Sequence, residues 1–127
     1  MQKKRVLLSI KPEFADKIFS GEKRFEFRRV IFRSPSVEKV VVYASSPVQQ
    51  VIGEFAVRRV LTLEKAELWN RTREHSGIAK NYFDEYFEDL ATGHAIEISS
   101  PVRYRKPLKL ESICESNRPP QSFYYLS

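Results

Sequence analysis

The sequence predicts an α+β domain in which short β-strands are combined with two to three helices. Its 127 residues suffice for one hydrophobic core but not for two, so we expect a single domain over residues 1–127. The 42% hydrophobic and 13% aromatic content is typical of a folded globular chain. Runs rich in β-branched residues at 39–44 and 51–63 indicate strands, whereas apolar residues spaced four apart at 14–18 and 78–86 indicate helices.

The first predicted elements are a strand and a helix. Residues 5–10 contain the apolar run Val6-Leu7-Leu8, which is typical of a buried strand. Pro12 suits the first turn of a helix, and an apolar stripe at helical spacing continues over residues 13–20. Gly21 is the expected C-terminal cap of this helix, because glycine adopts a left-handed conformation at little cost.

A dense cluster of charge follows at residues 21–29, where four cations and two anions are interleaved with two phenylalanines. Alternation along a strand would place Phe25 and Phe27 on one face and Arg24, Glu26 and Arg28 on the other. A glutamate flanked by arginines keeps its charge and is fixed in direction. The segment is therefore either a solvated face or one wall of a polar site, and these residues alone leave both interpretations open.

Two further strands are predicted in the middle of the chain. Residues 39–44 end at Ser45-Ser46-Pro47, whose hydroxyl groups either cap a turn or reach a ligand. Residues 51–63 can form one long strand, in which Gly53 permits the bend that a small barrel needs at a corner.

A polar connection separates two predicted helices. The first covers residues 63–71, and the connection at 71–77 carries Glu74 and His75, which suit proton transfer but are equally typical of a solvated loop. The second helix follows from Ser76, an N-cap candidate. Its apolar residues, which we expect to pack, are Ile78, Tyr82, Phe83, Tyr86, Phe87 and Leu90.

The C-terminal part combines strand signals with a basic segment. Residues 94–98 indicate a strand, and residues 101–107 form an extended basic segment with Tyr104 in its middle. Such a segment is either a plain edge strand or a surface that combines base stacking with phosphate contacts. Three aromatics at 123–125 indicate a docked final strand, and the donors and acceptors of Gln121 and Ser122 just before it suit recognition of a base edge.

The net charge of +6 is concentrated near the N-terminus. Residues 1–40 contain 11 Lys or Arg against 5 Asp or Glu, whereas residues 41–127 contain 11 of each. A localised basic face attracts nucleic acid by neutralising phosphates and releasing counterions. The plain alternative is that a modest positive charge only aids solubility.

Other classes of protein are disfavoured by composition. No run of the chain approaches the roughly 18 consecutive apolar residues of a membrane helix, and the N-terminus does not resemble a secretory signal, so we expect a cytoplasmic protein without membrane association. Cys114 is the single cysteine, which excludes an internal disulfide and a cysteine-rich zinc site. The four glycines are scattered, so no phosphate-binding glycine loop is present. We therefore expect neither metal nor cofactor.

The spacing Gly21-x-Lys23-x-x-Glu26-x-Arg28 resembles the G-x-K-x-x-E-x-R signature of the ASCH domain family, part of the PUA-like group of small β-barrels. In that family the signature follows a first strand and a helix, and the elements predicted here over residues 5–10 and 13–20 are similar. The resemblance extends to the strand before Ser45-Ser46-Pro47 and to the closing Pro119-Pro120-Gln121-Ser122-Phe123. It implies a small mixed or antiparallel β-barrel with loops gathered at one mouth.

Together with the charge, this resemblance predicts an RNA- or nucleoside-binding module with a polar, basic cleft at the barrel mouth. In the cleft, Lys11 and Arg28 would meet phosphate, and Glu26 would accept a hydrogen bond from a base or orient Arg28. The predicted ligand-binding residues are Ser9, Lys11, Lys23, Glu26, Arg28, Ser45, Ser46, Gln121, Ser122 and Phe123.

The alternative is a hydrolase. Some members of the family act as amidohydrolases on N4-acylated cytidine, with a lysine, a threonine three residues later and a glutamate beyond the long strand, and others are described as ribonucleases. The resemblance assigns the lysine to Lys23 and the glutamate, loosely, to Glu74, but Glu26 stands where the threonine would be. Glu26 would then act as a base on water while Lys23 stabilises the oxyanion. A third role, as an interaction domain in transcription or translation regulation, also stays open.

Overall fold

The computed structural model describes residues 3–126, and its centre is one mixed sheet of six strands. Three α-helices and two short 3₁₀ helices complete this part of the chain. In chain order the elements are β1 (Lys4–Ile10), α1 (Pro12–Ser20), β2 (Phe25–Arg28), β3 (Val37–Ala44), β4 (Gln50–Glu64), α2 (Lys65–Thr72), η1 (Arg73–His75), α3 (Lys80–Tyr86), β5 (Thr92–Leu108), η2 (Leu110–Ser112) and β6 (Tyr124–Leu126).

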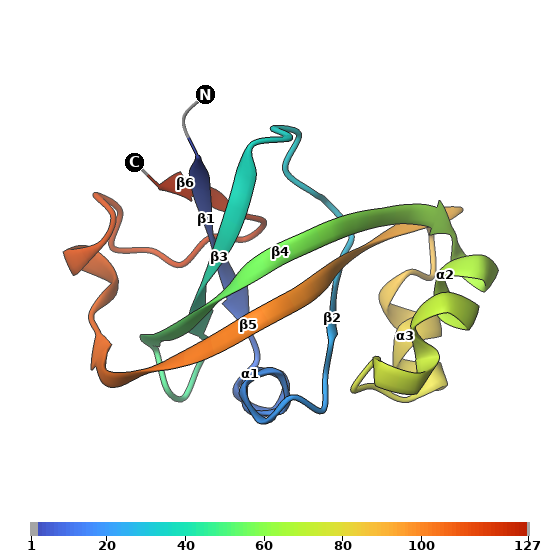
Figure 1. Cartoon of the computed structure of the whole chain (residues 1–127), viewed down its shortest axis with the longest axis horizontal. Coiled ribbons are helices and arrows are strands. Elements are labelled where there is room, and N and C mark those ends of the chain that lie inside the picture. The colour runs from blue at the N-terminus through green and yellow to red at the C-terminus, as the bar shows by residue number, and fades with distance from the viewer. Residues whose placement is uncertain (1–2, 127) are drawn as a thin grey trace.

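The strands lie in the order β2-β5-β4-β3-β1-β6. Strands β1 and β3 are parallel and the other neighbours are antiparallel. The two longest strands, β4 and β5, form a ribbon that crosses the whole molecule, with α2 and α3 at one end of it (Figure 1). Pairing along this ribbon shifts register at Gly53, as expected, and a Cβ atom there would lie 2.5 Å from both the Phe19 ring and the Val102 carbonyl oxygen.

The sheet curls in the manner of a barrel but does not close. Strand β6 pairs with β1 only at residues 5–7, so residues 8–10 of β1 have a neighbour on one side, β3. Among residues 3–126, strand β2 pairs with β5 alone, so its other edge has no neighbouring strand. We call the gap between β2 and residues 8–10 the seam. The predicted α+β fold with three helices is thus confirmed, with an open seam in place of a continuous wall.

Three apolar clusters hold the fold together. The first lies inside the curled sheet, where Ile18 of α1 packs against β1, β3 and β4. The second covers the opposite face around Leu7 and Leu110, beneath η2 and β6. The third joins Phe27 of β2 to Leu68 of α2 and to α3. Gly21 ends α1 with φ +88°, and its N–H donates to the Ile18 carbonyl, as the glycine cap requires.

Two stretches differ from the sequence prediction. Residues 94–98 and 101–107 belong to one strand, β5, because β4 continues to pair with both of them. Helix α3 begins at Lys80, not at Ser76, and Ala79 is its N-cap without a side-chain hydrogen bond. Ser76 is instead buried in the preceding loop, where its hydroxyl donates to the carbonyls of Arg73 and Ile78. None of the helices between residues 3 and 126 is long and apolar enough to span a membrane.

Candidate ligand pocket

A pocket of about 140 Å³ opens along the seam. Strands β1 and β2 form its floor, the start of α1 closes one side and α3 with the loop before it closes the other. Its lining residues are Ser9, Ile10, Lys11, Phe14, Lys23, Glu26, Phe27, Arg28, Ile78, Tyr82 and Tyr86. Five of the ten predicted binding residues are therefore gathered here, namely Ser9, Lys11, Lys23, Glu26 and Arg28.

Lys23 is the most unusual residue of the pocket, because its side chain is only 2% exposed. Its Nζ donates a 2.6 Å hydrogen bond to the Ser76 carbonyl oxygen. The same atom lies 4.9 Å from the ring centroid of Phe27 and 5.3 Å from that of Phe14. The ammonium group thus exchanges water for one carbonyl and two aromatic faces, which are weaker partners than bulk water for a full charge.

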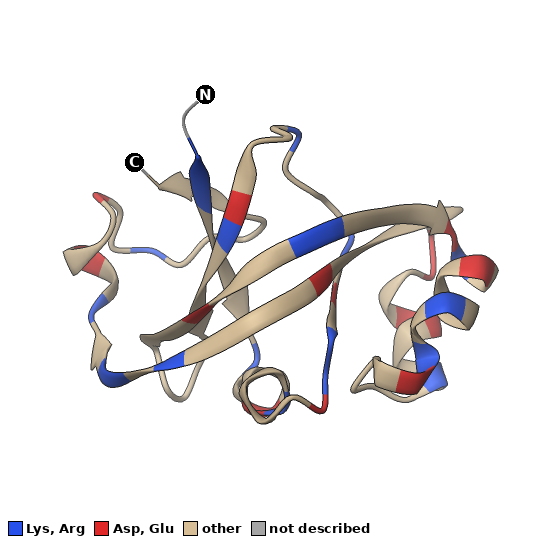
Figure 2. Cartoon of the chain, in the orientation of Figure 1, with Lys and Arg blue, Asp and Glu red and all other residues tan. Residues whose placement is uncertain are grey.

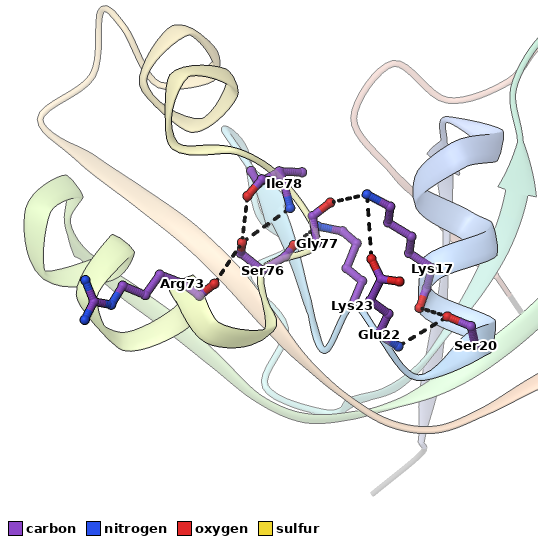
Figure 3. A network of polar contacts seen from close by, with 8 residues as sticks. All are labelled: Lys17, Ser20, Glu22, Lys23, Arg73, Ser76, Gly77 and Ile78. Carbon is purple, nitrogen blue, oxygen red and sulfur yellow. Dashed lines mark hydrogen bonds and ion pairs between the residues drawn. The ribbon is translucent and has the colours of Figure 1, made fainter.

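The loop Ser76–Ile78 fixes the position of Lys23. Gly77 has φ +69°, and a Cβ atom on it would lie 2.7 Å from both Cβ and Cγ of Lys23. The glycine therefore lets the loop backbone lie directly on the lysine stem. Lys17 Nζ donates to the Gly77 carbonyl at 3.2 Å and lies 3.8 Å from Glu22 Oε2, so the loop is also attached to α1 (Figure 3).

Burial changes the proton affinity of Lys23. Desolvation lowers the pKa of its ammonium group from 10.5 to about 8, with a smaller contribution from the positive charge of Lys17, and the carboxylate of Glu26 acts in the opposite direction. At pH 7 about a tenth of the molecules would carry a neutral Lys23. The side chain can therefore act as a donor or, in that fraction, as a base.

Glu26 and Arg28 form a buried ion pair beside Lys23. The Arg28 Nη1 atom lies 3.4 Å from Glu26 Oε2, and the two side chains are 11% and 8% exposed. Arg28 also donates to the Ser9 carbonyl at 3.3 Å and to the Ser122 carbonyl at 2.9 Å, so its guanidinium bridges the seam from β2 to β1 and to the segment before β6. As the alternation predicted, Phe25 and Phe27 pack into the third apolar cluster, and Phe27 also contributes to the pocket lining next to Lys23.

Aromatic side chains form the outer wall of the pocket. The rings of Tyr82 and Tyr86 are nearly parallel, at an angle of 14° and 6.3 Å between centroids. Phe14 meets Tyr82 edge-on at 5.2 Å, and Lys11 Nζ lies 5.3 Å from the Tyr82 centroid. The Tyr86 hydroxyl donates to the Phe27 carbonyl, and desolvation raises the pKa of this phenol. The pocket therefore combines an aromatic side with an ionic floor.

The other predicted site residues lie outside the pocket lining. Ser45 is half-buried and its N–H donates to the Ile10 carbonyl, which places the β3–β4 turn near the inner end of the seam, whereas Ser46 and Gln121 are exposed. Ser122 contributes its backbone carbonyl, to Arg28. Phe123 packs edge-on against Phe32 in the core. Glu74, the loosely assigned acid, is exposed on η1.

Several pocket residues were missed by the sequence analysis. The aromatic residues of α3 and of its C-cap, Phe87, were all expected to pack. Of these, Phe83 and Phe87 are buried, while Tyr82 and Tyr86 line the pocket. The signal was present in residue type, because tyrosines combine an apolar ring with a polar end that needs a partner. The role of Gly77 had no sequence signal. Within residues 3–126, no group of three His, Cys, Asp or Glu side chains is placed to hold a metal ion.

A family model, a relative and a solved structure all indicate the same domain family. A family model described as the ASCH domain matches residues 8–102. A Zymomonas mobilis protein named ASCH domain-containing ribonuclease is 31% identical over 126 residues, which are 98% of this chain and 85% of that protein. A crystal structure of ASCH from Zymomonas mobilis superimposes with a TM-score of 0.89 at 30% identity, covering 99% of this chain and 90% of the other.

Longer relatives also contain a similar segment. A Ureaplasma parvum protein named ATP synthase subunit alpha is 37% identical over 128 residues and matches 99% of this chain. A Ureaplasma parvum protein named large ribosomal subunit protein uL22 is 27% identical over 124 residues. This chain spans 16% of the length of the first protein and 39% of the second.

Proposed function

The chain belongs to the ASCH domain family, and from this premise we propose that the seam pocket binds one base of an RNA chain or of a modified nucleoside. The observation that carries the proposal is the burial of Lys23, Glu26 and Arg28 together against an aromatic wall. Buried charges are costly unless they are paired, and such clusters are concentrated at functional sites. The ribonuclease name of the Zymomonas mobilis relative supports RNA as the ligand class.

The pocket chemistry matches a nucleobase. Lysine and arginine offer donors to ring nitrogens and carbonyl oxygens, while the carboxylate of Glu26 accepts from an exocyclic amine or a ring N–H. The rings of Tyr82 and Tyr86 offer faces on which a base can stack, as in other single-stranded RNA sites. Planar ligands with donors and acceptors along one edge fit this arrangement.

The size of the pocket limits what enters it. Its 140 Å³ is below the roughly 300–1,000 Å³ of sites that enclose whole small molecules. One base can therefore enter while the sugar and phosphate stay at the rim. Lys11 is exposed at this rim, next to Tyr82, and would meet the phosphate.

Binding of a trinucleotide library to purified protein tests the proposal. Glu26→Gln keeps the shape of the side chain and removes its charge, and Lys23→Met keeps the buried stem. We expect each to weaken binding about tenfold or more, since a hydrogen bond to a charged group is worth about 1.5–3 kcal/mol. The matched controls are Glu85→Gln and Lys80→Met, which change exposed residues of α3 outside the pocket.

Two results would count against base binding in the pocket. One is equal affinity of wild type and both pocket variants, provided circular dichroism shows that the variants fold. The other is an absence of binding to any trinucleotide or nucleoside at millimolar concentration. If the variants fold, either result would mean that the buried cluster only stabilises the fold.

Hydrolysis of a modified nucleoside is a second candidate, favoured by the position of the Lys23 ammonium and the Glu26 carboxylate in the lining of one pocket. In this reaction Glu26 would take a proton from water while the hydroxide adds to an amide carbonyl carbon on the base. The oxyanion would form beside the Lys23 ammonium, and its collapse would break the C–N bond and return the proton to the leaving amine. Since this role needs the charged lysine, turnover should fall above pH 8.

Ribonuclease activity would give the opposite pH dependence if Lys23 acts as the base. Its neutral form would remove the proton of the 2′-hydroxyl, whose oxygen then bonds to phosphorus while the P–O5′ bond breaks and the leaving 5′ oxygen takes up a proton. Cleavage should therefore rise up to pH 8. Incubation with N4-acetylcytidine and with end-labelled RNA separates the cases. Binding without turnover of either would leave the protein a binding module, and Glu74→Gln, which changes an exposed residue, should have no effect in any case.

A further inference from the structure

A second positively charged surface lies at the far end of β5, away from α2 and α3. Arg105, Lys106 and Lys109 lie within five residues of one another here and are all exposed. Blue segments of the ribbon mark the cations at this end of β5 (Figure 2). Within residues 3–126, none of these three side chains makes an ion pair or hydrogen bond. We call these three residues the basic corner.

The basic corner is built on a bulge of the sheet. Gly53 of β4 pairs with Arg103 of β5, and Val51 pairs with Leu108, so a step of two residues on β4 faces a step of five on β5. The additional residues cannot join the ladder, and they project Arg105 and Lys106 from the sheet. Such bulges are features that redirect side chains, not packing defects.

Tyr104 holds this bulge in place. Its ring packs against the second apolar cluster, and its hydroxyl donates to Glu54 Oε1 at 2.9 Å. Burial and the neighbouring carboxylate raise the pKa of the phenol to about 12. Tyr104 is therefore an anchor beneath the bulge and not a platform for stacking, while Arg105 and Lys106 of the bulge are exposed.

Other exposed cations of the molecule are mostly neutralised. Arg58 and Arg59 both pair with Glu97, Arg71 pairs with Glu67, and Lys80 pairs with Asp84. Among those without an acid in the described chain, Arg24 and Arg33 lie in loops and Arg73 lies on η1. The basic corner concentrates uncompensated charge. The acids that follow it, Glu111 and Glu115, line the adjacent groove beside Cys114 and make no ion pair with it in residues 3–126.

We propose that the basic corner binds backbone phosphates of a single-stranded RNA whose base occupies the seam pocket. This inference rests on the proposed function. The two sites are connected by α1, because Arg103 at the start of the bulge lies 2.9 Å from Asp16, about 8 Å along the helix from the pocket residue Lys11. An RNA of several nucleotides can therefore reach both sites.

The test compares a 12-nucleotide RNA with a trinucleotide by fluorescence anisotropy between 50 and 300 mM NaCl. In the variant Arg105→Gln/Lys106→Gln/Lys109→Gln, the logarithmic salt slope for the 12-mer should become shallower by about 2, and affinity at 0.1 M salt should fall about ten- to a hundredfold. Trinucleotide affinity should not change. The control Arg58→Gln/Arg71→Gln/Lys80→Gln removes three ion-paired exposed cations and should retain the wild-type slope.

Several outcomes would overturn the inference. They are an unchanged slope in the basic-corner variant, equal affinity of wild type for the 12-mer and the trinucleotide, and an equal loss of slope in the control. Val102 and Leu108 beside the corner are 54% and 39% exposed, so vesicles with anionic lipid form another arm. Loss of vesicle binding with RNA binding intact would assign the corner to membranes instead. Loss of trinucleotide binding in Glu26→Gln reports on the pocket separately.

Discussion

The seam pocket buries the three charged groups of Lys23, Glu26 and Arg28, whereas the basic corner exposes three cations. In the pocket, Lys23 and Glu26 are 2% and 6% exposed, and each is held by packing or by a partner. In the basic corner, the cations are exposed and make no contact that fixes them among residues 3–126. The comparison teaches that one set of charges is organised before a ligand arrives, at a cost in stability, while the other costs the fold almost nothing.

Charges that are fixed before binding favour discrimination between ligands, whereas exposed charges favour attraction of any polyanion. A buried ion pair leaves an ill-matched ligand with unpaired groups, so errors are penalised by several kcal/mol. Solvated cations act on any polyanion and weaken as salt rises. If the two surfaces cooperate as proposed, the pocket determines which base is bound and the corner determines how strongly the chain is attracted.

The largest difference in stability is expected between Arg28→Met and Arg105→Met. Loss of the Arg28 guanidinium leaves Glu26 buried without its partner and removes the donors that bridge Ser9 and Ser122, so we expect a loss of about 3–5 kcal/mol. Arg105 is exposed, and its replacement should change stability by less than about 0.5 kcal/mol. Urea unfolding followed by circular dichroism measures both. A loss below about 1 kcal/mol for Arg28→Met would show that Glu26 is adequately solvated without it.

The second prediction concerns pH and compares Lys23 with Lys106. The folded-state pKa of Lys23 is about 8, whereas the unfolded chain retains the ordinary value of 10.5. Between these values the unfolded state binds more protons, so the stability of wild type should rise with pH, relative to Lys23→Met, by about 3 kcal/mol from pH 8 to pH 10.5. Groups that titrate in both proteins cancel in the difference. The free energy of unfolding of Lys106→Met should have the same pH dependence as that of wild type. If Lys23→Met also had the wild-type pH dependence, burial would not lower the pKa of Lys23.

Much of this difference between the two surfaces could be predicted from the sequence, because local residue patterns identify both β2 and β5. Alternation around Phe25 and Phe27 predicted which face of β2 holds Glu26 and Arg28, and the family spacing selected Lys23. Burial of Lys23 could not be predicted, since it depends on a loop about 53 residues later in the chain that packs on its stem. The basic segment at 101–107 was visible, but whether Tyr104 points in or out depends on a register shift against β4.

Tyr82 and Tyr86 show a further limit of sequence patterns. Helical spacing identified a broad apolar surface on α3, but it could not divide that surface between the core and a pocket. The division follows from the position of the seam, which exists because β6 pairs with only the first part of β1. Short-range patterns contain no information about the length of a strand that begins about 40 residues later in the chain.

The last prediction tests what fixes the pocket, and its expected effect is the smallest. Gly77 and Gly21 both have positive φ, so alanine costs about 1–2 kcal/mol of backbone strain at either position. Only at Gly77 does the added Cβ lie 2.7 Å from the Lys23 stem, whereas at Gly21 nothing lies within 4 Å. Gly77→Ala should therefore destabilise the fold by about 1–2 kcal/mol more than Gly21→Ala. It should also weaken trinucleotide binding, because the loop must withdraw from Lys23, while binding of the 12-mer should keep the wild-type salt slope. Equal effects of the two substitutions on stability and binding would show that Lys23 does not depend on the loop for its position.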